Sequence, residues 1–79
     1  MDAMKENMLG NMNWEAFSIK DLIRYKPDAV DDIYYHLGKM HSYEEMYKEL
    51  FKEDIPEPTL KNMTHASMMV DNWERRRRK

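Results

Sequence analysis

Residues 27–53, PDAVDDIYYHLGKMHSYEEMYKELFKE, carry the clearest helical spacing of apolar residues in this 79-residue chain. Gly38 divides this stretch into two halves. In the first half, apolar residues recur at intervals of three and four, which is the spacing of one face of an α-helix. Pro27 suits the first position of a helix, and Gly38 suits the left-handed residue that often follows the last one. This half therefore predicts a helix over residues 27–37, with an apolar face formed by Val30, Ile33, Tyr34 and Leu37.

The second half predicts a separate helix over residues 42–53. Ser42 and Glu45 have the spacing of a capping box, in which each side chain accepts a hydrogen bond from a backbone N–H at the start of the helix. The following IPEP segment ends the helix, because a residue before proline disfavours the helical conformation. The apolar face of this helix would be formed by Tyr43, Met46, Tyr47, Leu50 and Phe51.

The segments that flank this region are predicted to be helical as well. Upstream, Ser18 begins a short helix that Pro27 ends, and Trp14 and Phe17 just before it are expected to fill the core. Downstream, a helix begins near position 58 or 59, and no breaker follows it. One side of this last helix would carry Leu60, Met63, Ala66, Val70 and Trp73.

The chain as a whole is predicted to be all-α, because few stretches alternate in the manner of a strand and no hairpin signal is present. We expect a small bundle of three to four short helices with a longer C-terminal helix. Residues 14–74 would form a single helical domain, and residues 75–79 a basic C-terminal tail. Residues 1–13 hold a loose apolar stripe interrupted by Gly10, so this segment would be a helix that is either frayed or ordered by a partner.

Length and composition limit what the domain can be. A chain of this size buries only about 60% of the surface that its unfolded form exposes, and without cysteine no disulfide reinforces the thin core. Such cores often gain stability from an oligomer or a partner. The N-terminus lacks the basic start and apolar run of a signal peptide, and no stretch has the roughly 18 apolar residues of a membrane span. We therefore expect a soluble, cytoplasmic protein with no membrane contact, in a host cell if the chain is viral.

Charge is distributed unevenly along the chain. Residues 27–57 contain nine acidic and three basic residues, a net charge of −6, whereas the last five residues contribute +5 and the whole chain has −2. An acidic middle with a basic end indicates an interaction tail.

The sequence offers no recognisable catalytic centre. A nucleophile needs an adjacent base and a third group that orients the base, but cysteine is absent and Ser18 and Ser42 are interpreted as helix caps. The histidines at positions 36, 41 and 65 lack the spacing of a paired metal site, and two glycines are too few for a phosphate-binding loop. We therefore predict that the protein is not an enzyme and has no catalytic, cofactor-binding or metal-binding residues.

Methionine is unusually frequent, with nine residues, and this side chain is over-used on surfaces that adapt to partners. Met63, Met68 and Met69 lie too close together in the sequence to share one narrow core stripe. With Trp73 they are candidates for an exposed, partner-binding apolar patch, although methionine can also simply fill a small core. Tyr35 falls off the apolar stripe of its helix and is a candidate interface anchor.

The basic run at the C-terminus has several interpretations. Its cations can pair with carboxylates on an acidic protein surface, contact the phosphates of a nucleic acid, or remain solvated at a helix end where the dipole favours them. They can also reach the acidic middle of a second copy, which would give a homo-oligomer. The candidate partner-binding residues of this run are Arg75, Arg76, Arg77, Arg78 and Lys79.

One stretch resembles a known family. SYEEMYKELFKEDIPEPTL, residues 42–60, is similar to a stretch of the late-transcription coactivators of tailed phages, in which a helix that begins Ser-Tyr is followed by an Ile-Pro-Glu turn. The likeness covers about a quarter of the chain. That family implies a clamp-binding, acidic and apolar C-terminus, whereas this chain ends in ERRRRK. The resemblance therefore assigns a role to no residue and implies only a virus-encoded accessory protein.

These observations favour a small, non-enzymatic helical adaptor or inhibitor that acts by protein–protein contact. It would dock through the last helix, from Met63 to Trp73, with the basic tail directed at an acidic surface. One alternative is a nucleic-acid-associated transcription accessory protein, in which the two middle helices form a helix-turn-helix-like pair. The acidic residues of its second helix, Glu44, Glu45, Glu49 and Glu53, oppose that alternative. A further alternative is a structural component of a viral or other homo-oligomeric assembly.

Overall fold

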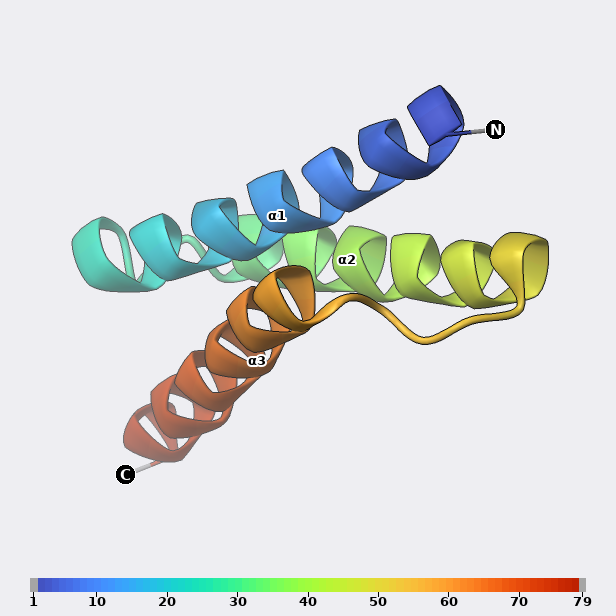
Figure 1. The fold of residues 1–79 in the computed structure, drawn as a ribbon. Coiled ribbons are helices and arrows are strands. Elements are labelled where there is room, and N and C mark those ends of the chain that lie inside the picture. The colour runs from blue at the N-terminus through green and yellow to red at the C-terminus, as the bar shows by residue number, and fades with distance from the viewer. Residues whose placement is uncertain (1, 79) are drawn as a thin grey trace.

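The computed structural model describes residues 2–78, which form three α-helices and no strand (Figure 1). Helix α1 spans Asp2–Tyr25, α2 spans Val30–Phe51 and α3 spans Glu57–Arg77. The all-α prediction is confirmed. The helices contain 24, 22 and 21 residues, so they are longer than the sequence pattern indicated, and α3 is the shortest of them.

Helix α1 is continuous and joins residues 2–13 to the short helix predicted around residues 18–26. Its buried side chains recur at intervals of three and four along one face, so the whole helix can pack on its neighbours. The helix ends shortly before Pro27, since a residue that precedes proline disfavours the helical conformation. The buried apolar residues of α1 are Met8, Met12, Ala16, Ile19 and Ile23.

Helix α2 corrects the prediction of two helices that meet at Gly38. It runs without a break over its 22 residues, and Gly38 lies in its interior without a positive φ. A glycine inside a helix costs about 1 kcal/mol relative to alanine. Burial of the apolar stripe outweighs this cost, because the stripe continues across the glycine. Its members Ile33, Met40 and Tyr47 are all fully buried.

The ends of α2 also differ from the prediction. Pro27 lies in the turn before the helix, and Ala29 caps the helix without a side-chain hydrogen bond. Ser42 lies inside the helix, so it forms no capping box. At the other end, the left-handed residue is Lys52, with φ 54°, and its N–H donates to the carbonyl of Lys48 at 3.0 Å.

The three helices share one core. Helix α1 packs against both α2 and α3, and Figure 1 shows both of these on one side of α1, with the opposite side uncovered. The linker between α2 and α3 adds Ile55, which is buried. The molecule is elongated, with extents of 45 × 18 × 16 Å. The buried methionines of the core are Met8, Met12, Met40 and Met63, so core filling explains part of the methionine content.

Helix α3 runs in the same direction as α1 and opposite to α2. Near its start, the side-chain amide of Asn13 donates to Thr59 Oγ1 at 3.1 Å. Near its end, Tyr34 at the start of α2 donates its hydroxyl hydrogen to Glu74 Oε2 at 2.6 Å. The C-termini of α1 and α3 and the N-terminus of α2 therefore lie at the same end of the molecule.

Several aromatic and apolar residues that the sequence analysis placed in the core are exposed. Trp14 and Phe17 project from α1 with 66% and 52% of their surface accessible. Successive residues of a helix are about 100° apart, which turns both side chains away from the stripe of Met12, Ala16 and Ile19. The other exposed residues from the predicted apolar faces are Tyr34, Met46, Leu50 and Leu60.

No helix within residues 2–78 combines the length and the apolar composition that a membrane crossing requires.

Candidate interaction surfaces

The last turn of α3 carries a ring of positive charge. Residues 75–77 are helical and Arg78 caps the helix, so these four arginines lie at the end of a helix, while Lys79 lies outside the described residues. Four consecutive helical positions point in four directions about 100° apart. All four arginines are exposed, and no ion pair found within residues 2–78 involves an arginine. The positive charge therefore surrounds the end of α3 and does not form a single basic face.

Trp73 fixes this helix end to the rest of the molecule. Its side chain is only 2% exposed, and its Nε1–H donates to the backbone carbonyl of Pro27 at 2.8 Å. The ring of Tyr34 meets it edge-on, with the centroids 5.4 Å apart, and the guanidinium of Arg77 lies 4.9 Å from its centroid. The expectation that Trp73 belongs to an exposed docking patch is wrong, because this ring closes the core at the α1–α2 turn.

The methionines of α3 divide between the core and the surface. Met63 is 4% exposed and shares the buried stripe of Ala66, Val70 and Trp73, so it cannot belong to an exposed apolar patch. Met69 is partly buried against the core. Met68 is 58% exposed, on the side of the helix away from the core. The predicted face from Met63 to Trp73 is therefore an interior surface, and among the described residues of this segment Met68 is the exposed methionine.

Two tyrosines lie at the surface near the start of α2. The hydrogen bond from Tyr34 to the Glu74 carboxylate raises the pKa of the Tyr34 phenol, because ionising the phenol would place two negative charges in contact. Tyr35 is exposed, with Lys39 Nζ 5.3 Å from its ring centroid and the ring of His36 at 5.3 Å. This position leaves Tyr35 accessible, and its role as an interface anchor stays a prediction.

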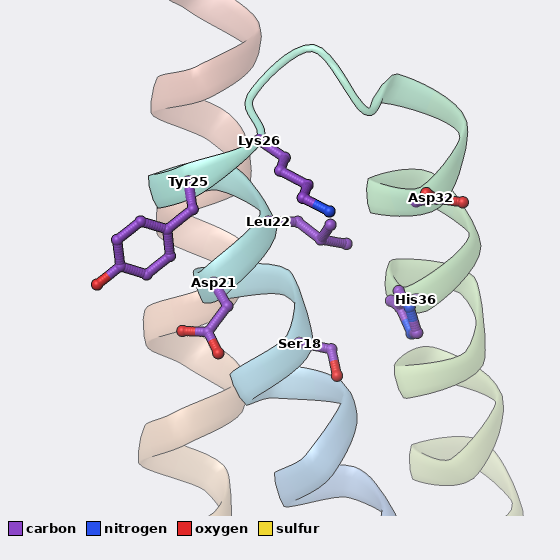
Figure 2. A pocket seen from close by; sticks show the side chains of 7 residues that line it. All are labelled: Ser18, Asp21, Leu22, Tyr25, Lys26, Asp32 and His36. Atoms are coloured by element: carbon purple, nitrogen blue, oxygen red, sulfur yellow. The ribbon is translucent and has the colours of Figure 1, made fainter.

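A shallow cleft of about 370 Å³ lies between α1 and α2 near the turn that joins them (Figure 2). Beside it, the carboxylate of Glu15 is held by His36 Nδ1 at 2.5 Å and by Lys39 Nζ at 3.7 Å. Glu15 is buried, and its charge raises the pKa of Lys39. The cleft is lined by Ser18, Asp21, Leu22, Tyr25, Lys26, Asp32 and His36.

The cleft brings together residue types that occur in catalytic sites. Ser18 lies inside α1, so it is not the helix cap that the sequence suggested, and it lines the same cleft as His36. Glu15 orients the His36 ring through Nδ1. No hydrogen bond connects Ser18 to His36 within residues 2–78, and no group of three or more potential metal ligands occurs in that range. The prediction that the protein is not an enzyme stays a prediction.

Two features of α1 were not predicted from the sequence: the contact of Glu15 with His36, and the exposed side of the helix that carries Trp14 and Phe17. Glu15 follows Met12 by three positions and precedes Ile19 by four, so helical spacing alone marks it as a residue of the buried side. The same spacing places Trp14 and Phe17 on the outer side of one long helix. A helix predicted to begin only at Ser18 hides that signal, because Trp14 and Phe17 then lie before its start.

No protein-family model matches the chain, and neither a curated protein nor a solved structure shows significant similarity to it.

Proposed function

We propose that this protein is a small, non-enzymatic helical adaptor that binds an acidic surface of another protein through the arginine-bearing end of α3. One observation carries the proposal. Arg75, Arg76 and Arg78 are exposed on a helix that Trp73 anchors, and within residues 2–78 they form no ion pair. Arginine forks bind carboxylates in a bidentate manner, so an acidic partner surface would satisfy them.

Part of the charge pattern has a purely local explanation. Cations near the C-terminus of a helix and anions near the N-terminus are favourable by about 0.3–1 kcal/mol each. Arg24 in the last turn of α1, and Asp31 and Asp32 in the first turn of α2, follow this rule. The arginine run exceeds what the rule requires, because it concentrates like charges at one helix end, where Arg75 and Arg78, three positions apart, repel each other.

The helical conformation of the arginine run supports an adaptor more than a solvated tail. A flexible tail loses side-chain and backbone freedom when it binds. Here residues 75–77 are already helical, so only side-chain order remains to be lost. Charge placed in this way also accelerates encounter with a surface of opposite sign.

A nucleic-acid-associated accessory protein remains the second candidate, because the same arginines can contact phosphates. The middle of the chain argues for a protein partner. Residues 27–57 have a net charge of −6 and would repel a phosphate backbone, which confines any such contact to the end of α3. A structural role in a homo-oligomeric assembly is the third candidate.

The proposal can be tested with two defined polyanions. Dye-labelled poly-glutamate stands in for an acidic protein surface, and a labelled DNA duplex stands in for nucleic acid. Binding of each is measured by fluorescence anisotropy between about 50 and 200 mM salt. The test variant replaces Arg75, Arg76 and Arg78 by glutamine and keeps Arg77 on the Trp73 ring. The matched control replaces Lys48, Lys52 and Lys61 by glutamine, which removes the same charge elsewhere.

We expect the arginine variant to bind poly-glutamate at least about tenfold more weakly than the lysine variant does. Equal losses in both variants, or no poly-glutamate binding at low salt, would contradict the proposal. Tighter binding to DNA than to poly-glutamate, with a steep salt dependence that the arginine variant loses, would favour the nucleic-acid candidate instead.

A further inference from the structure

We propose that the buried Lys20 of α1 is a second anion-binding site, which takes a carboxylate of the acidic protein partner where α1 meets α3. The proposal rests on the function proposed above in one respect, since the same acidic partner supplies the carboxylate. The site itself is separate from the arginine end of α3 and can be tested separately.

Lys20 is a buried cation without a counter-ion. Its side chain is 9% exposed, and no ion pair found within residues 2–78 includes it. A lysine is almost never buried in this way unless an opposite charge accompanies it, because removing an ammonium from water is costly. Glu15, the other buried charged residue in the described part of the chain, has such company, since it contacts both His36 and Lys39.

The contacts of Lys20 inside the molecule do not replace a counter-ion. Its ammonium donates one hydrogen bond to Asn62 Oδ1, at the long distance of 3.5 Å, and lies 5.1 Å from the centroid of the Phe17 ring. Asn62 is held in this orientation because its Nδ2–H donates to Asn13 Oδ1 at 2.9 Å. An ammonium has three N–H donors, so two of them have no acceptor within residues 2–78.

The carboxylates near this contact lie on the α2 side instead. Asp21 follows Lys20 directly in the sequence, yet it lines the cleft between α1 and α2 (Figure 2). On α3, Asp71 lines a pocket beside α2, and Glu74 accepts the hydrogen bond from Tyr34 of α2. The α1–α3 contact at Lys20 is therefore positively charged, and an acidic group from outside the molecule would complete it.

The surroundings of the ammonium favour such a group. The Phe17 ring and the packed helices displace water, so a carboxylate is attracted more strongly here than at a fully solvated lysine. The site is accessible, because Phe17 is 52% exposed and Asn62 is partly exposed. Arg24 lies one turn further along α1 and is exposed, with its guanidinium 5.9 Å from the centroid of the Tyr25 ring. Two cations one turn apart suit a segment that carries more than one carboxylate.

The arginine end of α3 lies within reach of the same partner segment. From Asn62, which contacts Lys20, to Arg76 the helix rises about 21 Å, for fourteen residues at about 1.5 Å each. An extended chain covers this distance with about six or seven residues at about 3.3 Å each. A short acidic segment can therefore contact Lys20 and the arginine end together.

Lys20→Met tests the proposal, because methionine keeps an unbranched apolar stem and removes the charge. Thermal unfolding and poly-glutamate binding, by fluorescence anisotropy at low salt, are measured on the full chain. A buried charge without a counter-ion destabilises the fold, so Lys20→Met should raise the unfolding temperature by about 4 °C or more. The same variant should bind poly-glutamate at least about fivefold more weakly than Lys61→Met, the matched control at an exposed lysine of α3.

The proposal would be overturned if Lys20→Met and Lys61→Met bound poly-glutamate equally well. A lower unfolding temperature for Lys20→Met than for the wild type would also overturn it, because Lys20 would then stabilise the fold through its contacts with Asn62 and Phe17. Stabilisation of the wild type by inorganic phosphate alone, to the same degree as by poly-glutamate and lost in Lys20→Met, would replace the protein partner by a small anion.

The two binding sites can fail independently. If poly-glutamate binding depends on Arg75, Arg76 and Arg78 but not on Lys20, the adaptor proposal stands and the site at Lys20 is refuted. If binding depends on Lys20 but not on those arginines, the site at Lys20 stands and the arginine end is refuted. An absence of binding at low salt would refute both.

Discussion

Replacing Trp73 by alanine distinguishes a core residue from a docking residue. The side chain is 2% exposed, donates a 2.8 Å hydrogen bond to Pro27 and packs edge-on against Tyr34. Truncating a buried tryptophan to alanine costs about 3–5 kcal/mol. Of this, the hydrogen bond accounts for about 1 kcal/mol and the aromatic pair for about 0.5–1.5 kcal/mol.

This loss is large for so small a domain. A chain of 79 residues has a total stability of about 4–12 kcal/mol at typical values per residue. At about 4–8 °C per kcal/mol, the variant should unfold at least about 12 °C below the wild type. Trp73→Phe, which keeps a ring and loses the N–H donor, should lie between the two.

Urea and thermal unfolding followed by far-ultraviolet circular dichroism, at low protein concentration, measure these differences. The matched control is Trp14→Ala, because the same side chain is removed from a position that is 66% exposed. Surface substitutions of this kind usually change stability by no more than about 0.5 kcal/mol. If Trp73→Ala and Trp14→Ala were equally stable, the assignment of Trp73 to the core would be wrong.

Three further predictions follow from the described contacts. Gly38→Ala should raise the free energy of unfolding by about 0.5–1 kcal/mol, because Gly38 is an interior helical residue; a decrease in thermal unfolding experiments would restore it as a left-handed cap. Hydrogen bonds from Lys5 and Tyr47 lower the pKa of Glu53 below its ordinary value of 4.5, so this carboxylate stabilises the fold above that pH and the contribution is lost on acidification. The wild type should therefore lose more stability than Glu53→Gln between pH 7 and pH 3, and equal losses would refute the pairing. The hydrogen bond to Glu74 raises the pKa of the Tyr34 phenol above 10.0, so the stabilising effect of this bond is complete below pH 10 and is lost as the phenol ionises. Difference absorbance between the wild type and Tyr34→Phe should show this late ionisation, and Glu74→Gln should move the ionisation to lower pH.

Periodicity predicted the helical regions well and their boundaries poorly. The stripe that includes Ile33 and Tyr47 correctly marked residues on the core side of α2. The sequence predicts a helix end at Gly38, because glycine favours that role locally. Its actual conformation depends on packing against α1 along the whole of α2, and local propensity yields to such tertiary burial.

The residues of the candidate surfaces were predictable only in part. The arginine run is visible in the sequence, and the continuation of α3 through Arg77 keeps it accessible. The high methionine content wrongly favours a surface role for Met63 and Trp73, whose helical spacing matches that of the buried Ala66 and Val70. The pairing of Glu15 with His36 joins residues 21 positions apart on different helices, and no local pattern predicts such a contact.

The most direct test of the adaptor proposal is a map of where an acidic probe binds. Amide chemical shifts of isotope-labelled full-length protein are recorded during titration with poly-glutamate at low salt. The proposal predicts that the largest changes lie at residues 74–78, with smaller ones at the Trp73 indole and the α1–α2 turn that it contacts. Changes centred on the cleft beside Glu15 and His36, or on the exposed side of α1 that carries Trp14 and Phe17, or no changes at all, would contradict the assignment of the arginine end of α3 as the binding surface.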